Sequence, residues 1–153
     1  MESIQDFEDM LSLLHEHDVK YLIIGGLAFI YHAKPRYTKD MDLWIDPLDE
    51  NIDHTNLALA EFGSPTLIDK GDSDQIIQIG VAPDRIDLIL SVQGLDFDEA
   101  WERRIEGVYG QAPANWIDID SLIRIKDAID HPRHRDDAHT LKRVRDGHPP
   151  SSQ

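Results

Sequence analysis

The segment Tyr21-Leu22-Ile23-Ile24-Gly25-Gly26 constrains the fold more than any other part of the sequence. A short, uninterrupted apolar run that stops at glycine predicts a buried β-strand followed by a tight turn. The mostly apolar residues 27–31 then predict a short helix, which Pro35 ends because proline disfavours helical continuation. The chain is therefore expected to run from a strand, through a glycine turn, into the start of a helix.

Residues 40–45, Asp40-Met41-Asp42-Leu43-Trp44-Ile45, alternate in polarity along a second predicted strand. Side chains of a strand point alternately to its two faces, so both aspartates share one face and Met41, Leu43 and Ile45 share the other. Trp44 falls on the aspartate side, where a core or rim position is expected for it and lining a pocket is the alternative. Pro47 is expected to close the strand.

Other segments carry weaker signals of the same kind. Apolar residues recur at helical spacing between Ile4 and Leu14, and Ser3 with Asp6 fits a capping pattern. Similar signals predict helices over residues 3–17, 49–62, 96–104, 121–130 and 134–146, a hairpin of strands over 75–79 and 85–91, and a strand near Val108. We expect one domain, 1–147, followed by a disordered tail, 148–153.

The composition excludes several classes of protein. With 30 Asp and Glu against 15 Lys and Arg, the formal charge is −15, which argues against broad binding of duplex nucleic acid. The absence of cysteine excludes disulfides and thiolate chemistry. The longest apolar run is far below the roughly 18 residues of a membrane span, and Met1-Glu2-Ser3 opens no basic signal-peptide region, so a cytoplasmic protein without membrane contact is expected.

The Asp40-x-Asp42 pair suggests a metal site. Two neighbouring carboxylates at the end of a strand repel each other unless a cation compensates them, and Mg²⁺ prefers oxygen ligands. Asp87 interrupts the apolar run Ile86-Asp87-Leu88-Ile89-Leu90, where an unpaired charge would be costly to bury. If the two strands are neighbours, Asp40, Asp42 and Asp87 converge. A solvated acidic loop is the alternative interpretation.

The glycine turn provides the complementary half of an anion site. Gly25 and Gly26 let the backbone approach a triphosphate closely, and the helix that follows would direct free N–H groups toward it. Arg36 and Thr38 stand just before the aspartates and are further candidates for phosphate contact, although Thr38 would also suit the start of the strand. Each signal is common when taken alone, and their order along the chain makes the combination more specific.

Three motifs together resemble the polymerase-β-type nucleotidyltransferase superfamily. They are Ile24-Gly25-Gly26-Leu27-Ala28, then Arg36-Tyr37-Thr38-Lys39-Asp40-Met41-Asp42-Leu43, then Ile86-Asp87-Leu88. The stretch from Leu122 to Leu141 resembles the Lys…Arg-x-x-Asp tail of the AbiEii-like branch, which includes toxins of toxin–antitoxin systems. Arg135 stands where that branch usually has lysine.

This resemblance implies an α/β (α+β) nucleotidyltransferase fold, with a central mixed sheet flanked by helices and with C-terminal helices. It implies two Mg²⁺ ions on Asp40, Asp42 and Asp87, the last also helping to deprotonate an acceptor hydroxyl. It further implies nucleotide contacts from Lys126 and a role in or beside the site for Asp136. For Lys126 an exposed helical lysine is an equal alternative.

The expected reaction moves a nucleotide from an NTP to an acceptor and releases pyrophosphate. The acceptor stays open between a tRNA end, a protein side chain and a small molecule. A non-catalytic, antitoxin-like module that acts through a partner protein is one rival hypothesis, and a metal-dependent phosphohydrolase is another. An RNA acceptor would be held locally by basic residues between Arg124 and Arg145, unless these only pair with nearby aspartates. The spacing of His131, His134 and His139 matches no standard zinc site.

Overall fold

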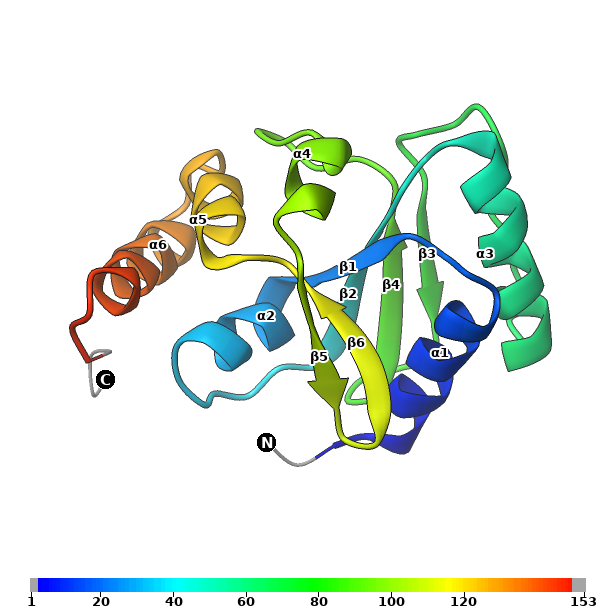
Figure 1. The fold of residues 1–153 in the computed structure, drawn as a ribbon, viewed down its shortest axis with the longest axis horizontal. Helices are drawn as coiled ribbons and strands as arrows, with labels where there is room; N and C mark the ends of the chain where they lie inside the picture. Colours follow the sequence, from blue (N-terminus) through cyan, green and yellow to red (C-terminus); the bar gives the residue numbers. More distant parts are fainter. Residues whose placement is uncertain (1–2, 150–153) are drawn as a thin grey trace.

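The computed structural model describes residues 3–149, and the predicted tail residues 150–153 lie outside this part. Six strands form one sheet: β1 (Tyr21–Ile24), β2 (Asp40–Ile45), β3 (Ile76–Ile79), β4 (Arg85–Ile89), β5 (Ile105–Tyr109) and β6 (Ala112–Trp116). The helices are α1 (Gln5–Glu16), α2 (Gly25–His32), α3 (Asp49–Phe62), α4 (Phe97–Glu102), α5 (Ile119–Asp127) and α6 (Pro132–Arg145). Figure 1 shows their arrangement.

The sheet is mixed, with strand order β3-β4-β2-β1-β6-β5. The β1–β2, β3–β4 and β5–β6 pairs are antiparallel, whereas β2–β4 and β1–β6 are parallel. In the parallel β2–β4 pair the register runs from Asp40 opposite Arg85 to Trp44 opposite Ile89. This register places Asp42 directly beside Asp87.

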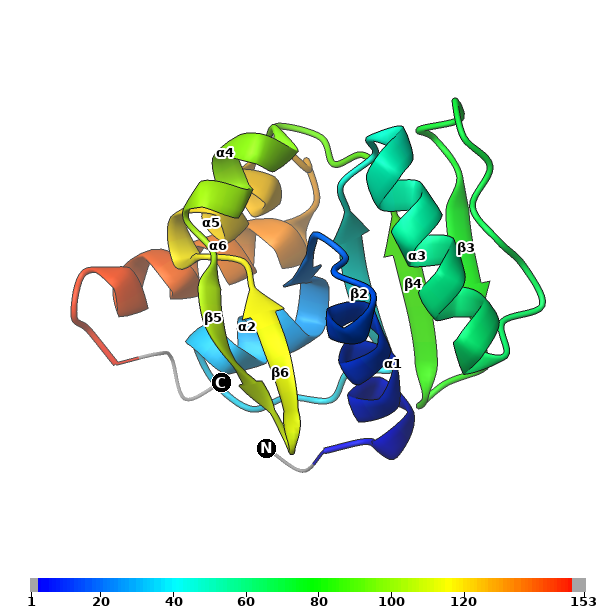
Figure 2. The same ribbon diagram turned by 45° about the vertical axis from the view of Figure 1, so that its right-hand side comes forward.

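Two apolar clusters cover the two faces of the sheet. The first contains Met41, Leu43 and Ile45 of β2 and packs against α1 and α3, which lie together on one side (Figures 1 and 2). The second contains Trp44 of β2 and packs against α2, α4 and α5. The predicted division of β2 into an aspartate face and an apolar face is therefore confirmed.

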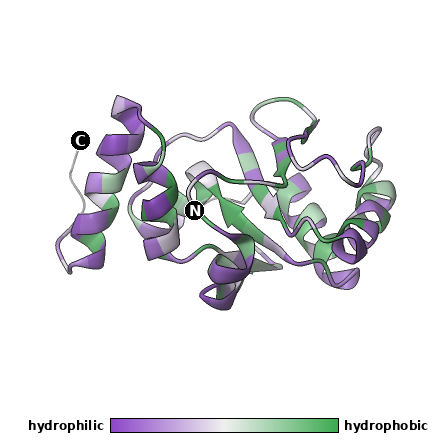
Figure 3. Cartoon of the chain, turned by 90° about the horizontal axis from the view of Figure 1, so that it is seen from above, coloured by the Kyte–Doolittle hydropathy of each residue, from purple (hydrophilic) through white to green (hydrophobic). Residues whose placement is uncertain are grey.

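Helix α6 lies farther from the sheet and packs mainly against α5. Most of its residues are hydrophilic, and it forms one end of the molecule (Figure 3). None of the helices in residues 3–149 has the length and apolarity that crossing a bilayer requires.

The predicted elements are present, with one omission and one misplaced cap. The strand near Val108 is β5, but its partner β6 was missed, because Pro113 interrupts a short run that lacks alternation. The expected capping role of Ser3 is wrong: Ile4 precedes α1 without a side-chain cap, and the Ser3 hydroxyl donates to Glu8 instead. Helix α3 ends, by contrast, at Gly63 with a left-handed φ of 94°, as is usual for a terminal glycine.

Candidate active site

Three carboxylates converge where β2 and β4 begin. Asp40 and Asp42 project from one face of β2, and Asp87 projects from β4 beside Asp42. One carboxylate oxygen of each residue lies within 4.8 Å of the corresponding oxygens of the other two. It is the one group of metal-ligating side chains at such distances in residues 3–149. The parallel register thus brings together residues that are far apart in the sequence.

Arg85 reaches two of these carboxylates. Its Nη2 donates to Asp40 Oδ2 at 2.6 Å and to Asp87 Oδ2 at 3.3 Å, and its Nε lies 3.1 Å from Asp87 Oδ1. Sequence analysis missed this residue. The available signal was its position two residues before Asp87, which puts both side chains on the same face of β4. The guanidinium compensates part of the negative charge of the cluster.

Among the described residues, no cation forms such a contact with Asp42. Burial, and after it the charges of Asp40 and Asp87, raise its pKa to about 7 against the opposing effect of Arg85. The pKa of Asp87 is also raised, mainly by burial, against the effect of Arg85. Three oxygen donors that repel one another, one of them without a counterion, form a set that fits Mg²⁺.

The glycine turn lies directly against this cluster. Gly25 has a left-handed φ of 69°, and a Cβ on it would fall 2.1 Å from Asp42 Oδ2. A Cβ on Gly26 would fall 2.6 Å from the hydroxyl oxygen of Thr38. The side chains of Asp42 and Thr38 come so close to this turn that both positions require glycine. Helix α2 begins at Gly25. The first turn of this helix therefore presents its free N–H groups next to the carboxylates.

A cavity of about 350 Å³ opens beside the cluster, and we call it the aspartate cavity. Seven of the predicted site residues line it: Gly25, Gly26, Arg36, Thr38, Asp40, Asp42 and Lys126. Four further residues also line it: Tyr37, Lys39, Arg133 and His134. Of these, Arg133 lies among the basic residues considered above for contact with an RNA acceptor. Asp87 belongs to the carboxylate cluster but does not line this cavity.

Asp137 organises the side of the cavity formed by α5 and α6. It accepts two hydrogen bonds from the Arg36 guanidinium, at 2.7 and 3.0 Å, and its Oδ2 lies 3.0 Å from Lys126 Nζ. Burial alone would raise the pKa of Asp137, but the hydrogen bonds from Arg36 and Lys126 outweigh it and lower the pKa. Lys126 is only 5% exposed, which excludes an exposed helical lysine. Burial lowers its pKa, against the effect of Asp137.

Asp136 takes a different position from the one expected. It is exposed and does not line the aspartate cavity, whereas Asp137 is buried and contacts two residues of that cavity. Successive residues of a helix point about 100° apart, so a motif that marks the right segment can still indicate the wrong side chain. The structure therefore places Asp137, not Asp136, beside the site.

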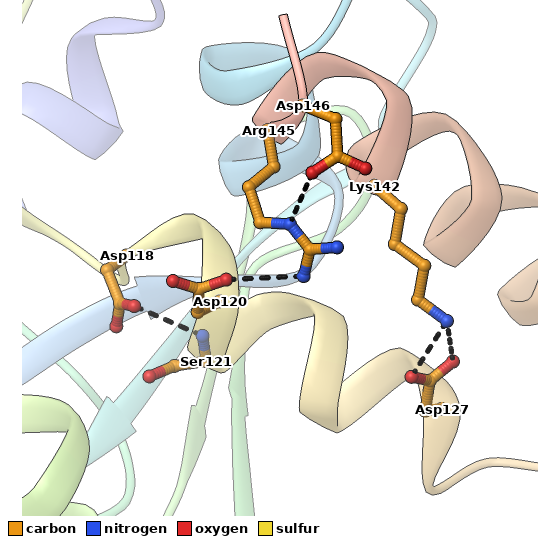
Figure 4. Close-up of polar contacts among 7 residues, drawn as sticks. All are labelled: Asp118, Asp120, Ser121, Asp127, Lys142, Arg145 and Asp146. Atoms are coloured by element: carbon orange, nitrogen blue, oxygen red, sulfur yellow. Dashed lines mark hydrogen bonds and ion pairs between the residues drawn. The ribbon is translucent and has the colours of Figure 1, made fainter.

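Most other cations near the C-terminus are paired. Lys142 Nζ lies 3.2 Å from Asp127, and Arg145 lies 3.4 Å from Asp120 and 3.2 Å from Asp146 (Figure 4). Arg135 pairs with Asp130, and Arg124 pairs with Glu99. Carboxylates thus offset much of the positive charge of α5 and α6. Arg133 differs, because it lines the aspartate cavity and has no ion-pair partner among the described residues.

Two further candidates have structural roles. Trp44 is buried against Phe97, with ring centroids 5.2 Å apart, and does not line the aspartate cavity. His131 caps α6, where its Nδ1 accepts a hydrogen bond from the backbone N–H of Arg133. Within residues 3–149 the histidines form no group suited to a metal ion.

Comparison with protein-family models and with curated proteins gives no match. Among solved structures, the fold is similar to that of ANT(2'')-Ia in complex with adenylyl-2''-tobramycin. The TM-score is 0.61 and the sequence identity 18%, over 92% of this chain and 87% of that chain. This chain has a nucleotidyltransferase fold. The predicted mixed sheet flanked by helices is thereby confirmed.

The raised pKa of Asp42 predicts how Asp42→Asn changes stability with pH. The unfolded chain loses this proton near pH 4 and the folded chain only near pH 7, so ionisation of Asp42 destabilises the fold as the pH rises between these values. We expect Asp42→Asn to be more stable than wild type by roughly 1–3 kcal/mol above pH 7, where partial solvation limits the gain. The gain should shrink toward zero near pH 4. Thermal denaturation across this range measures it, with the exposed Asp53→Asn as control. If the stability gained by Asp42→Asn did not change with pH, the pKa of Asp42 would not be raised in the folded protein.

Gly25→Ala tests the close approach of the turn to Asp42. The matched control is Gly63→Ala, which also has a left-handed φ but has nothing within 4 Å of the added Cβ. The backbone cost of about 1–2 kcal/mol is common to both variants. We expect Gly25→Ala alone to displace Asp42 and weaken Mg²⁺ binding at least about tenfold, equivalent to 1.4 kcal/mol. Calorimetric titration with Mg²⁺ measures this, and equal affinities in both variants would refute it.

Asp137→Asn and Asp136→Asn distinguish the two neighbouring aspartates. The first leaves the Arg36 and Lys126 cations without their common counterion and should destabilise the fold by about 3 kcal/mol, as breaking a buried ion pair does. The second removes an exposed charge and should change stability by no more than about 0.5 kcal/mol. Urea denaturation of both variants measures the difference. Equal stabilities would show that Asp137 does not organise this side of the cavity.

Proposed function

We propose that this protein is a magnesium-dependent nucleotidyltransferase that moves an NMP from an NTP to an acceptor hydroxyl. The observation that carries the proposal is the convergence of Asp40, Asp42 and Asp87 beside a cavity that also contains the glycine turn and several cations. Carboxylates suit a divalent cation, and the N–H groups and cations suit a polyphosphate. A single site that offers both fits an NTP with its magnesium.

In this proposal the three aspartates hold Mg²⁺, which would supply charge stabilisation for the displacement at phosphorus. The backbone at Gly25 and Gly26 and the hydroxyl of Thr38 receive phosphate oxygens. Arg36 and Lys126, already fixed by Asp137, present positive charge from the opposite side. Pre-positioned groups of this kind lose little entropy when the substrate binds.

The transfer itself balances without any oxidant or reductant. The acceptor oxygen forms a bond to the α-phosphorus of the NTP, and the bond from that phosphorus to the bridging oxygen breaks, releasing pyrophosphate. Asp87 takes the proton of the acceptor hydroxyl, and the raised pKa of this carboxylate makes it a stronger base than an ordinary aspartate. Arg85, which contacts Asp87, would keep it in position.

The structural neighbour supports this class of reaction, because ANT(2'')-Ia is bound there to an adenylylated aminoglycoside. For the present chain we propose an acceptor that is held at the mouth of the aspartate cavity. The ion pairs of Lys142, Arg145, Arg135 and Arg124 leave little unpaired positive charge for a long nucleic acid. The AbiEii-like branch, a role in a toxin–antitoxin system and a cytoplasmic location stay predictions from the sequence.

Transfer of label from each α-³²P-labelled NTP, with Mg²⁺ and a cell extract as the source of acceptors, tests the proposal. Wild type should label one fraction and release pyrophosphate, and EDTA should abolish both. Asp40→Asn and Asp42→Asn should lower transfer at least about a thousandfold, equivalent to 4 kcal/mol, whereas Asp53→Asn should keep it.

Other outcomes would identify the rival hypotheses. Release of inorganic phosphate in place of pyrophosphate would indicate a phosphohydrolase. Absence of both products with every NTP and with extracts of several cell types, in a protein that is folded and binds Mg²⁺, would favour a non-catalytic module acting through a partner protein.

A further inference from the structure

A second cavity lies at the opposite end of β1 from the carboxylate cluster. Its volume is about 510 Å³, and it lies between the α1–β1 connection, the end of α4 and the β5–β6 hairpin. We call it the hairpin cavity. Lys20 lines it and Gly25 lines the aspartate cavity, so about 16 Å of strand separates them at roughly 3.3 Å per residue. The two cavities share no lining residue.

The hairpin cavity exists because the sheet opens between β1 and β6. These strands pair at one position, Ile23 opposite Trp116, and diverge toward the start of β1 (Figures 1 and 2). Near the opening, the backbone N–H of Asn115 donates to the hydroxyl of Tyr21 at 3.1 Å and not to the backbone of β1. The same hydroxyl lies 2.8 Å from His15 Nε2, which completes this wall of the cavity.

Asn115 gives the cavity a polar side chain. The residue is only 6% exposed and lines the cavity, and its side-chain amide has no hydrogen bond to any described residue. This amide offers a donor and an acceptor together. A ligand that fills the cavity should therefore present both a donor and an acceptor to Asn115.

Charged groups of both signs surround the opening. Two cations lie over the ring of Trp101: the Arg104 guanidinium at 3.9 Å and the Lys20 ammonium at 5.7 Å from its centroid. Arg104 donates to Glu106 at 2.8 Å. Lys20 and Asp18 both line the cavity and form no ion pair with a described residue. The ammonium of Lys20 and the carboxylate of Asp18 therefore stay available to a ligand. Together with Arg104 and Glu106 they form a set of four groups with no net formal charge.

We propose that the hairpin cavity binds a small zwitterion of the free amino acid type. The carboxylate of the ligand would face Lys20 and Arg104, its ammonium would face Asp18 and Glu106, and its polar atoms would pair with Asn115. Because the cavity has positive and negative groups at separate places, it should bind a zwitterion more tightly than a ligand with only one kind of charge. The site is too far from the carboxylate cluster to hold the acceptor of the proposed transfer, and it does not depend on that function.

Trp101 provides a local reporter of binding. It lies at the cavity wall and is partly exposed, whereas Trp44 is only 1% exposed, does not line this cavity and serves as an internal control. The twenty free L-amino acids would be added one at a time to ¹⁵N-labelled protein, at about 10 mM, which fills most of a site with millimolar Kd. At least one should shift the Trp101 indole N–H resonance without shifting that of Trp44. Its N-acetyl and carboxamide derivatives, which each lack one charge, should bind at least about tenfold more weakly.

Lys20→Gln and Asn115→Leu should each weaken binding of that amino acid at least about tenfold. Lys70→Gln, which removes an exposed lysine outside the cavity, should leave the affinity unchanged. Lys20 is exposed, so its variant should fold even if Asn115→Leu does not. The proposal is overturned if no amino acid shifts Trp101, if the singly charged derivatives bind equally well, or if Lys20→Gln binds like wild type.

Discussion

Mutual repulsion among Asp40, Asp42 and Asp87 is the constraint on which the rest of the site depends. The parallel register of β2 and β4 forces the three carboxylates together, and the sheet cannot relieve the strain without losing that register. Arg85 offsets part of the charge, but it contacts Asp40 and Asp87 and not Asp42. The fold thus holds a concentration of negative charge that a divalent ion would stabilise, in a chain whose formal charge is already −15.

The surroundings of Asp42 show how tightly the two halves of the site are joined. Its carboxylate occupies the space that a side chain at Gly25 would need, so the glycine turn lies directly against the acidic cluster. On the far side of the cavity, Asp137 links Arg36, from the α2–β2 connection, to Lys126 of α5. Each half is fixed by contacts between segments far apart in the chain, which limits movement before any substrate binds.

The alternation of polar and apolar residues was sufficient to predict the position of a side chain where this depends on a single strand. The face shared by Asp40 and Asp42 follows from alternation, and the convergence with Asp87 required only that two strands be neighbours. Three features could not be predicted in this way. Arg85 acts through its reach across two strands, Asp137 replaces Asp136 because helix phase depends on packing, and β6 contains Pro113 and lacks alternation. All three depend on tertiary context, which local patterns do not encode.

The aspartate cavity draws on both ends of the folded region, and this has a consequence for synthesis on the ribosome. A nascent chain that has emerged only as far as β6 already contains the three aspartates and the glycine turn, but it lacks Lys126, Arg133 and Asp137. Completion of α6 therefore separates, in time, the assembly of the acidic cluster from the assembly of the whole cavity.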